Sequence, residues 1–286
     1  MHVMPVADLT AMIQDVMRKK MKTRFAKSAD EVRVAQRLRY QVFHDELGAA
    51  LDSKLKVDED RFDAIAHHLL VIENDGTAAL EYPLQDGNLV GTSRLLTQDG
   101  SLGAEAFYSS AEFDLAPLLA RNQGLTFLEL GRSCVLKRCR NASVLELLWQ
   151  GIWDFVRSHE IDVMIGCASF PGRDPSLHAR ALDFLFKEHG ASGKWQTAGR
   201  YDRLAPTNFS SIPDAGDPAL IRTLPPLVKG YLRLGAMFGQ GAVVDHAFNT
   251  VDVLVVLPIA NINPRFFNRF GGPVGLSPYV RKRHLA

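Results

Sequence analysis

The stretch that decides the fold is Phe127-Leu-Glu-Leu-Gly-Arg-Ser-Cys-Val-Leu-Lys-Arg138. Its alternating apolar residues predict a buried strand that runs into a basic turn and a new helix beginning near Asn141. Glu129 and Arg132 fall inside this strand. Because an unpaired buried charge is costly, these two side chains must either neutralise each other or serve a ligand. The strand therefore predicts a place where a polar group is handled.

Hydrophobic periodicity on both sides of this strand predicts alternating strands and helices. We expect helices near residues 29–47, 142–158 and 175–188, and strands near 67–73, 88–96, 126–136, 162–168, 195–204 and 251–258. A strand, a helix and a second strand joined by a crossover of this length imply a parallel pair, so the predicted fold class is α/β. Residues 205–222 read as a linker, 224–238 as a helix or a set of turns, and 265–284 as a polar tail.

The composition is that of an ordinary globular protein: 47% of the 286 residues are hydrophobic and 23% are charged. A net charge of +1 argues against a nucleic-acid partner. The three cysteines form no Cys-x-x-Cys pair, so we expect reduced thiols and no metal site. We expect no signal peptide and no membrane span, because the longest apolar run, residues 253–260, is far shorter than the roughly 20 residues a span requires. The expected location is the cytoplasm.

Residues 1–28 form a basic segment. Six Lys and Arg residues outnumber two Asp residues, and apolar residues recur at helical spacing from Leu9 to Met17, which predicts a basic amphipathic helix over residues 7–21. Two interpretations stay open. The helix packs on its own domain, or it docks as an arm on an anionic membrane, where each Lys or Arg near the headgroups contributes about 1 kcal/mol.

Three further polar segments precede the strand with Glu129 and Arg132. They are Arg37-Leu-Arg-Tyr-Gln-Val-Phe-His-Asp-Glu-Leu47, Lys56-Val-Asp-Glu-Asp-Arg-Phe-Asp63 and Leu89-Val-Gly-Thr-Ser-Arg-Leu-Leu96. They supply an Arg and a Phe on the first helix, an Asp-x-x-Asp loop and an Arg on a strand, and the Glu-x-x-Arg at 129–132 follows. This pattern resembles the signature of the acyl-homoserine-lactone synthases.

The chain resembles still more closely the ornithine N-acyltransferases that make lyso-ornithine lipid. The phrases of that family's type are Arg39-Tyr-Gln-Val-Phe43, Met164-Ile-Gly-Cys-Ala-Ser-Phe-Pro-Gly172, Leu224-Pro-Pro-Leu-Val-Lys-Gly-Tyr231 and Phe248-Asn-Thr-Val-Asp252. The resemblance covers residues 30–271. It implies a Gcn5-related N-acetyltransferase fold, a mixed twisted sheet flanked by helices. The expected parts are a basic amphipathic N-terminal arm (1–28), an acyltransferase core (29–204) and a C-terminal extension (205–286) that completes the sheet and the substrate pocket.

The resemblance also implies the reaction: transfer of a 3-hydroxyacyl chain from acyl carrier protein to the α-amino group of L-ornithine, with no bound cofactor. The expected product is lyso-ornithine lipid, made at the inner face of the bacterial membrane. Lactone synthesis from S-adenosylmethionine and acylation of lysine, glycine or glutamine are the alternatives. Lactone synthases usually carry an aromatic residue shortly after the Phe, whereas residues 45–50 after Phe43 contain no Trp.

The acceptor side requires groups of both charges. An amino acid brings a carboxylate, which an Arg guanidinium binds best, and ornithine adds a side-chain ammonium that calls for a carboxylate. On the resemblance, the substrate-binding candidates are Arg39, Phe43, Asp60, Asp63 and Arg94. Catalysis is expected from Glu129, which would take a proton from the amine, and from Arg132. The alternative is that these charged side chains only pair with one another.

The donor side is expected at the strand-to-helix junction, where backbone amides at a helix N-terminus bind phosphate and a strand edge pairs with the pantetheine arm. The donor-binding candidates are Val135, Leu136, Lys137, Arg138, Arg140, Asn141 and Ser143. Coenzyme A loops of this fold family usually carry glycines, which residues 138–143 lack. This favours acyl-phosphopantetheine, with its single phosphate, on an acidic carrier protein. The alternative is a solvated basic cluster without a ligand.

Other reactive side chains are interpreted as structural. Cys134 lies in an apolar strand without an evident His base, which favours a buried thiol over an acyl-enzyme nucleophile. His67 and His68 are adjacent on a strand, so their side chains point to opposite faces and do not share a metal. For the apolar residues of 224–238, core packing is favoured over an acyl-chain tunnel.

Overall fold

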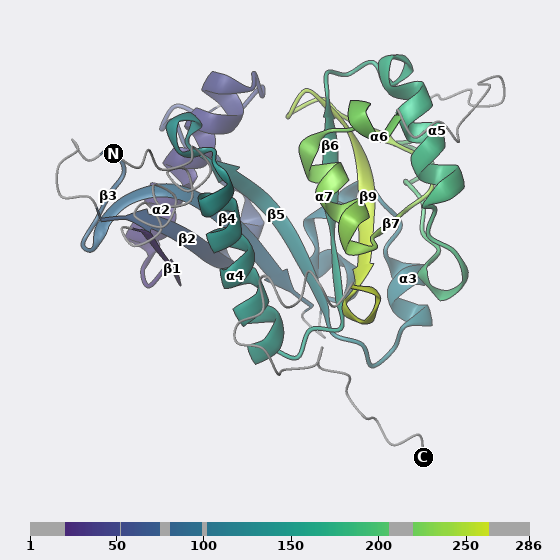
Figure 1. Ribbon diagram of the computed structural model, residues 1–286, viewed down its shortest axis with the longest axis horizontal. Coiled ribbons are helices and arrows are strands. Elements are labelled where there is room, and N and C mark those ends of the chain that lie inside the picture. The colour runs from purple at the N-terminus through teal and green to yellow at the C-terminus, as the bar shows by residue number, and fades with distance from the viewer. Residues whose placement is uncertain (1–20, 52, 75–80, 99–101, 206–219, 263–286) are drawn as a thin grey trace, which may run out of the picture. The chain divides into compact units, whose positions relative to one another are not determined.

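The computed structural model describes residues 21–51, 53–74, 81–98, 102–205 and 220–262 (Figure 1). The strands are β1 (Met21–Phe25), β2 (His67–Glu73), β3 (Pro83–Leu84), β4 (Gly87–Thr97), β5 (Phe127–Val135), β6 (Val163–Pro171), β7 (Met237–Phe238), β8 (Val243–Asp245) and β9 (Thr250–Pro258). The α-helices are α2 (Ala29–Tyr40), α3 (Ala116–Arg121), α4 (Ala142–Ser158), α5 (Ala179–Glu188), α6 (Leu220–Thr223) and α7 (Pro226–Leu234). A π-helix, η1 (Gln41–Glu46), continues α2. Short 3-10 turns are η2 (Arg61–Ala64), η3 (Gly103–Ala106), η4 (Tyr108–Ala111), η5 (Lys137–Cys139), η6 (Pro175–His178), η7 (Gly193–Trp195) and η8 (Ile259–Asn261).

The chain divides into two compact units. Unit 1 comprises residues up to 47, 51–95 and 132–155, and unit 2 comprises residues 48–50, 96–131 and 156 onwards. The chain passes from one unit to the other inside β4 and inside β5, so neither unit is a continuous segment. The division into arm, core and extension stays a prediction.

Unit 1 is a sheet with a helix on each face. The strands lie in the order β1, β2, β4 and the second half of β5, and β2 is antiparallel to both β1 and β4. Helix α4 packs closely on one face, because a Cβ added to Gly151 would come within 2.7 Å of the Leu69 side chain on β2. His67 faces the same helix, with its ring 4.9 Å from that of Phe155. The neighbouring His68 points the other way, toward the side that α2 covers, and is buried.

Unit 2 is built around β6 and β9. The order is the first half of β5, then β6, β9 and β7, and β8 also pairs with β9. Strand β6 is parallel to β5, with Phe127 opposite Val163, and antiparallel to β9 along its whole length. Helix α7 packs on β6 and β9, while α6 packs on α5. Within the described part of the chain, no helix is long and apolar enough to cross a membrane.

The predicted elements were largely confirmed. Helix α4 and strand β2 have the bounds that the periodicity predicted, the β5–α4–β6 segment forms the expected parallel pair, and the α/β class holds. The helix expected at 29–47 is α-helical only to Tyr40, and the helix expected at 175–188 opens as a 3-10 turn after Pro175. The segment 224–238 is helical as α7, which ends at Gly235 in the left-handed conformation with φ +89°.

The strand expected at 195–204 was wrong. After η7, single bridges through Ala198, Gly199 and Leu204 replace a continuous strand. A turn starting at Arg200 folds Leu204 back so closely that a Cβ on Gly199 would lie 2.8 Å from the Leu204 side chain. The predicted amphipathic helix, most of the linker and the polar tail lie outside the described residues, and Met21 already belongs to β1.

Candidate active site

Unit 1 brings together three arginines and three aspartates on the face of the sheet opposite α4. Helix α2 carries Arg39, β4 carries Arg94 and β5 carries Arg132, while the aspartates come from the loop that ends in η2. Arg94 pairs in register with His68, so both point to the same face. We call this group the Arg–Asp cluster; its members are Arg39, Asp58, Asp60, Asp63, Arg94 and Arg132.

Asp63 is the most heavily bonded carboxylate of the cluster. Arg39 donates to both its oxygens in a two-pronged contact, Nη1 to Oδ1 at 2.8 Å and Nη2 to Oδ2 at 2.9 Å. Arg94 adds a bond of 3.1 Å to Oδ1, and Gln36 adds one of 3.0 Å to Oδ2. Burial opposes the ionisation of Asp63, but the hydrogen bonds from Arg39 and the charges of Arg39 and Arg94 outweigh it, so the pKa lies well below its usual range. Asp63 is therefore an anion at neutral pH.

Asp58 links two arginines. Its Oδ2 accepts from Arg39 Nε at 2.9 Å and from Arg132 Nε at 3.0 Å. Arg132 sits in the middle of β5 with φ +50°, a left-handed conformation that costs free energy in a side chain other than glycine. The bond to Asp58 thus holds a strained residue in place. Asp58 lies in a quoted segment, yet sequence reasoning did not single it out, because nothing in the spacing separates it from Asp60.

Access to solvent differs across the cluster. The side chains of Arg39 and Arg94 are fully buried, whereas that of Arg132 is 10% exposed and that of Asp60 is 22% exposed. The ion pair between Arg132 Nη2 and Asp60 Oδ2, at 3.3 Å, is also the longest in the cluster. Three positive and three negative charges balance, so the buried part needs no ligand. A charged ligand would meet the cluster at Asp60 and Arg132.

Two further residues predicted for the acceptor side are Phe43 and Glu129. Phe43 lies half-buried on the π-helix η1. Glu129 belongs to unit 2, where it is buried and its two oxygens accept main-chain hydrogen bonds from Tyr108 N at 2.6 Å and Ser109 N at 2.9 Å. These bonds fix the orientation of the carboxylate.

The predicted donor loop is partly engaged with its own chain. Asn141 caps α4 by accepting the Val144 N–H at 3.1 Å. Arg138 pairs with Glu73 at 2.9 Å, and Arg140 pairs with Glu46 and donates to the Val135 carbonyl. The Leu136 amide donates to the Val90 carbonyl at 2.9 Å, and Ser143 is buried. Lys137, Arg138 and Arg140 nevertheless keep exposed side chains.

Cys134 behaves as the sequence predicted. It is buried in β5, and burial raises the pKa of its thiol to about 12. The thiol therefore stays protonated near neutral pH and is a poor nucleophile. The prediction that His67 and His68 point to opposite faces is also confirmed, since His67 is exposed and His68 is buried.

A second polar group, which sequence reasoning missed, lies in unit 2. Oxygens of Glu112 and Asp252 and the sulfur of Cys167 all lie within 4.8 Å of one another. The Cys167 thiol donates to Glu112 Oε2 at 3.6 Å, and burial first, then the charge of Asp252, raises the pKa of Glu112 to about 7. Burial also raises the pKa of the Cys167 thiol well above 9, so it holds its proton and is a poor metal ligand. Asp252 stands in one of the quoted phrases, but Glu112 lies in a loop without periodicity.

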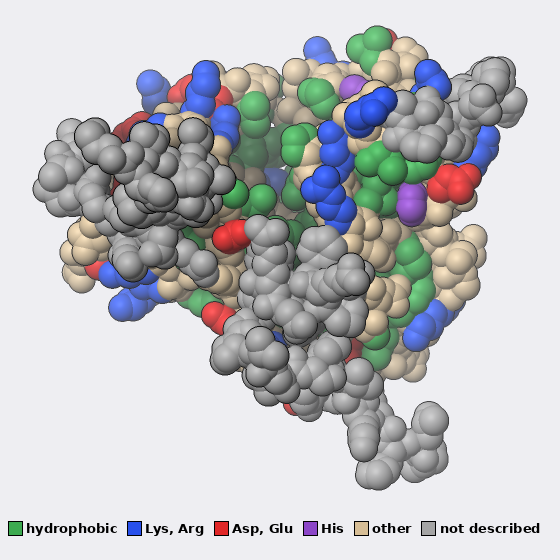
Figure 2. All heavy atoms as spheres, viewed as in Figure 1, with side chains coloured by type: hydrophobic (Ala, Val, Ile, Leu, Met, Phe, Trp, Pro, Cys, Tyr) green, Lys and Arg blue, Asp and Glu red, His purple; other side chains and the backbone are tan. Residues whose placement is uncertain are grey.

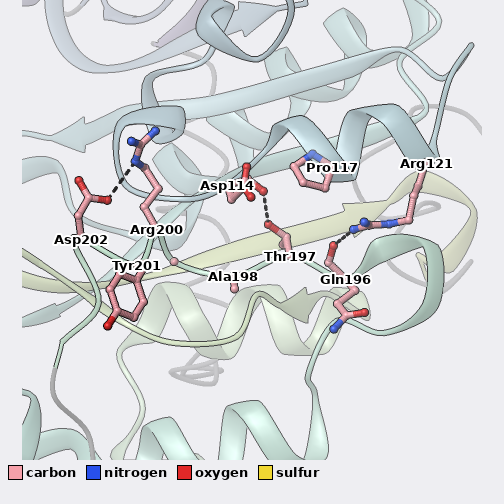
Figure 3. Close-up of a pocket in the computed structure, with 10 residues that line it drawn as sticks. Asp114, Pro117, Arg121, Gln196, Thr197, Ala198, Arg200, Tyr201 and Asp202 are labelled. Atoms are coloured by element: carbon pink, nitrogen blue, oxygen red, sulfur yellow. Dashed lines mark hydrogen bonds and ion pairs between the residues drawn. The ribbon is translucent and has the colours of Figure 1, made fainter.

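Unit 2 also contains a cavity of about 610 Å³ (Figure 3). Asp114, Pro117 and Arg121 line one side and residues 196–202 the other. Its polar groups are bonded to each other: Thr197 donates to the Asp114 carbonyl, and Arg121 donates to the Gln196 carbonyl. None of the predicted site residues lines this cavity.

The chain matches known proteins over most of its length. The family model described as an acetyltransferase (GNAT) domain matches residues 38–150. The L-ornithine N(alpha)-acyltransferase of Agrobacterium fabrum is 45% identical over 255 residues, which cover 88% of this chain and 85% of the relative. The relative of the same name from Rhizobium meliloti is 43% identical over 95% of this chain and 89% of its own length. The solved AHL synthase LasI is 12% identical and covers 90% of this chain and 98% of its own, with a TM-score of 0.48, which is too low to add to the assignment.

Proposed function

The chain belongs to the L-ornithine N(alpha)-acyltransferase family, and we propose that it transfers a 3-hydroxyacyl chain from acyl carrier protein to the α-amino group of L-ornithine. The product is then lyso-ornithine lipid. The observation that carries the proposal is the identity to relatives of that name over most of the chain. The enzyme is an acyltransferase, as the acetyltransferase domain also indicates.

The acceptor binds at the solvent-reaching edge of the Arg–Asp cluster. Arg132 takes the α-carboxylate and Asp60 attracts the side-chain ammonium, because these two members are the accessible ones and their own pair is long. Asp58 holds Arg132, and Arg94 holds Asp60. Arg39 and Asp63 complete this buried support, and Phe43 covers the apolar part of the substrate. A preorganised support of this kind keeps the entropic cost of binding low.

Acyl transfer requires an unprotonated α-amine. The amine of an amino acid is largely protonated near neutral pH, so Glu129 accepts that proton, directly or through water. The amine nitrogen then attacks the thioester carbonyl, the C–S bond breaks, and the pantetheine sulfur leaves and takes up a proton. The two main-chain bonds from Tyr108 and Ser109 support this role by holding the Glu129 carboxylate in one orientation.

The donor is acyl-phosphopantetheine on acyl carrier protein, bound at residues 135–143. The exposed Lys137, Arg138 and Arg140 attract an acidic carrier by long-range steering. The basic arm attaches the enzyme to the inner face of the bacterial membrane, where an amphiphilic product leaves into the bilayer. Residues 1–20 make this attachment, because Met21–Phe25 form strand β1 of the sheet. No nucleic acid takes part.

Mass spectrometry tests this function. The full chain is incubated with 3-hydroxyacyl carrier protein and an equimolar mixture of ornithine, lysine, glycine and glutamine, and in a parallel reaction with S-adenosylmethionine. We expect N-acylornithine as the main product. A dominant product from another amino acid would replace ornithine as the acceptor, and an acylated lactone from the parallel reaction would make the enzyme a lactone synthase.

A further inference from the structure

Unit 2 carries a surface on which apolar and cationic side chains lie exposed together. Its apolar members are on η6, α6 and α7, and its arginines are on the turn before η6, on α5 and on α6. We call it the α5–α7 surface; its members are Arg173, Leu177, Arg180, Ile221, Arg222 and Leu227. Figure 2 shows Lys and Arg side chains interspersed with hydrophobic ones over the region where Figure 1 shows α5, α6 and α7.

The exposed apolar side chains sit on a well-held framework. Asp174 caps η6 through the Ser176 N–H, and His178 Nε2 donates to the Pro171 carbonyl at 2.8 Å. The ring of His178 also packs on Phe170, at 5.1 Å between centroids. This fixed turn presents Leu177 with 75% of its surface exposed. Its exposure is thus a feature of the fold.

The arginines of the α5–α7 surface differ from Arg138 and Arg140 of unit 1 in whether they have an acidic partner. Arg138 and Arg140 pair with Glu73 and Glu46, as described above. Arg173, Arg180 and Arg222 form no ion pair with any described residue. Asp174, next to Arg173, stays ionised, and its Oδ1 accepts the Ser176 N–H and hydroxyl instead of pairing with Arg173. The surface therefore offers three guanidinium groups to an external anion.

A single exposed leucine is ordinary, but exposed aliphatic side chains beside unneutralised arginines suit one environment in particular. At the surface of an anionic bilayer, short apolar side chains enter the headgroup region while guanidinium groups bind lipid phosphates. Helix α5 buries its own apolar residues from Ala181 to Phe186, and α6 packs on it. The exposed side chains of Leu177 and Ile221 are therefore not needed to complete the apolar core.

We propose that the α5–α7 surface docks on an anionic membrane, with Leu177, Ile221 and Leu227 entering the headgroup layer and Arg173, Arg180 and Arg222 binding lipid phosphate. This contact is separate from the N-terminal arm. The proposal holds whichever amino acid the enzyme acylates. Docking can therefore be measured without substrates.

Flotation of the full chain with vesicles of phosphatidylcholine containing one third phosphatidylglycerol tests the proposal. Two backgrounds are used, the parent and the arm variant Ile13→Asp/Val16→Asp. We expect Arg180→Gln/Arg222→Gln to weaken binding about 30-fold in either background, since each arginine near the headgroups contributes about fivefold. Leu177→Asp should weaken it further. The matched controls, Arg33→Gln and Leu145→Asp, change an exposed arginine paired with Glu59 and an exposed leucine on α4, and should bind as their background does.

Equal flotation of Arg180→Gln/Arg222→Gln and its background would overturn the proposal. Unchanged flotation with a raised KM for acyl carrier protein would show instead that the surface binds the carrier. Thermal melts confirm that each variant is folded. Acylation of ornithine in detergent should be the same in all variants, so failure of the acyltransferase function and failure of membrane docking give different results.

Discussion

Replacing Glu112 by Gln should change how the stability of the protein depends on pH. Burial, followed by the charges of Asp252 and Asp245, raises the pKa of Glu112 from 4.5 to about 7 and outweighs the opposing effects of Cys167 and Arg203. Between pH 4.5 and about 7, Glu112 is therefore protonated in the folded protein but ionised in the unfolded chain. The resulting stability is complete below about pH 4.5 and is lost as the pH rises through about 7.

The magnitude follows from the two pKa values. The difference between 4.5 and about 7 corresponds to about 3 kcal/mol of unfolding free energy. Glu112→Gln has nearly the same shape, can accept a hydrogen bond from the Cys167 thiol through its amide oxygen, and carries no charge. We expect the variant to be more stable than the parent by less than about 1 kcal/mol at pH 5 and by up to about 3 kcal/mol at pH 8.

Urea unfolding of both proteins at pH 5, 6, 7 and 8 measures this difference. Glu105→Gln is the matched control, because Glu105 is an exposed glutamate of the same unit. The difference between Glu112→Gln and the parent should grow with pH, whereas the difference for the control should stay constant. Stability curves of Glu112→Gln and the parent that run parallel from pH 5 to 8 would show that Glu112 is ionised in the folded protein throughout.

Three further predictions concern the proposed active site. Glu129→Gln should lower turnover by roughly 10² or more with the fold intact; activity within about threefold of the parent would exclude it as the base. Asp58→Asn should lower the free energy of unfolding by about 3 kcal/mol, because it leaves a buried charge uncompensated. The more exposed Asp60→Asn should cost less than Asp58→Asn in urea unfolding, because Arg94, the buried partner of Asp60, keeps its bond to Asp63; equal costs would remove the gradient across the cluster. Charge reversal of Arg138 and Arg140 should slow the carrier-protein reaction chiefly at low salt, and acyl carrier protein should be a better donor than acyl-coenzyme A by kcat/KM; equal values for the two donors would contradict this.

The periodicity of apolar residues predicted those helices and strands whose bounds depend on local burial. Strand β2 and helix α4 have the expected bounds because alternating and helical apolar patterns report which face is buried. The sequence also pointed to the residues of the Arg–Asp cluster, but it could not predict their partners. Asp58 and Asp60 are two positions apart in one loop, and only the folded backbone places Asp58 between Arg39 and Arg132.

Long-range packing accounts for the rest. Glu112 and Asp252 come together because a loop without regular periodicity lies against β9, a contact that no local pattern records. The expected strand at 195–204 failed for a similar reason. Its residues have strand-like composition, but the turn beginning at Arg200 closes Leu204 onto Gly199.

The π-helix at the end of α2 constrains the number of residues in this segment as well as their identity. A π-turn accommodates one residue more than an α-turn, so the segment Gln41–Glu46 acts as a one-residue insertion into the helix. Removing one residue there would let the helix continue in α geometry. It would also rotate everything beyond the deletion by about 100° relative to Arg39. Evolution can therefore exchange side chains along this segment more freely than it can shorten it.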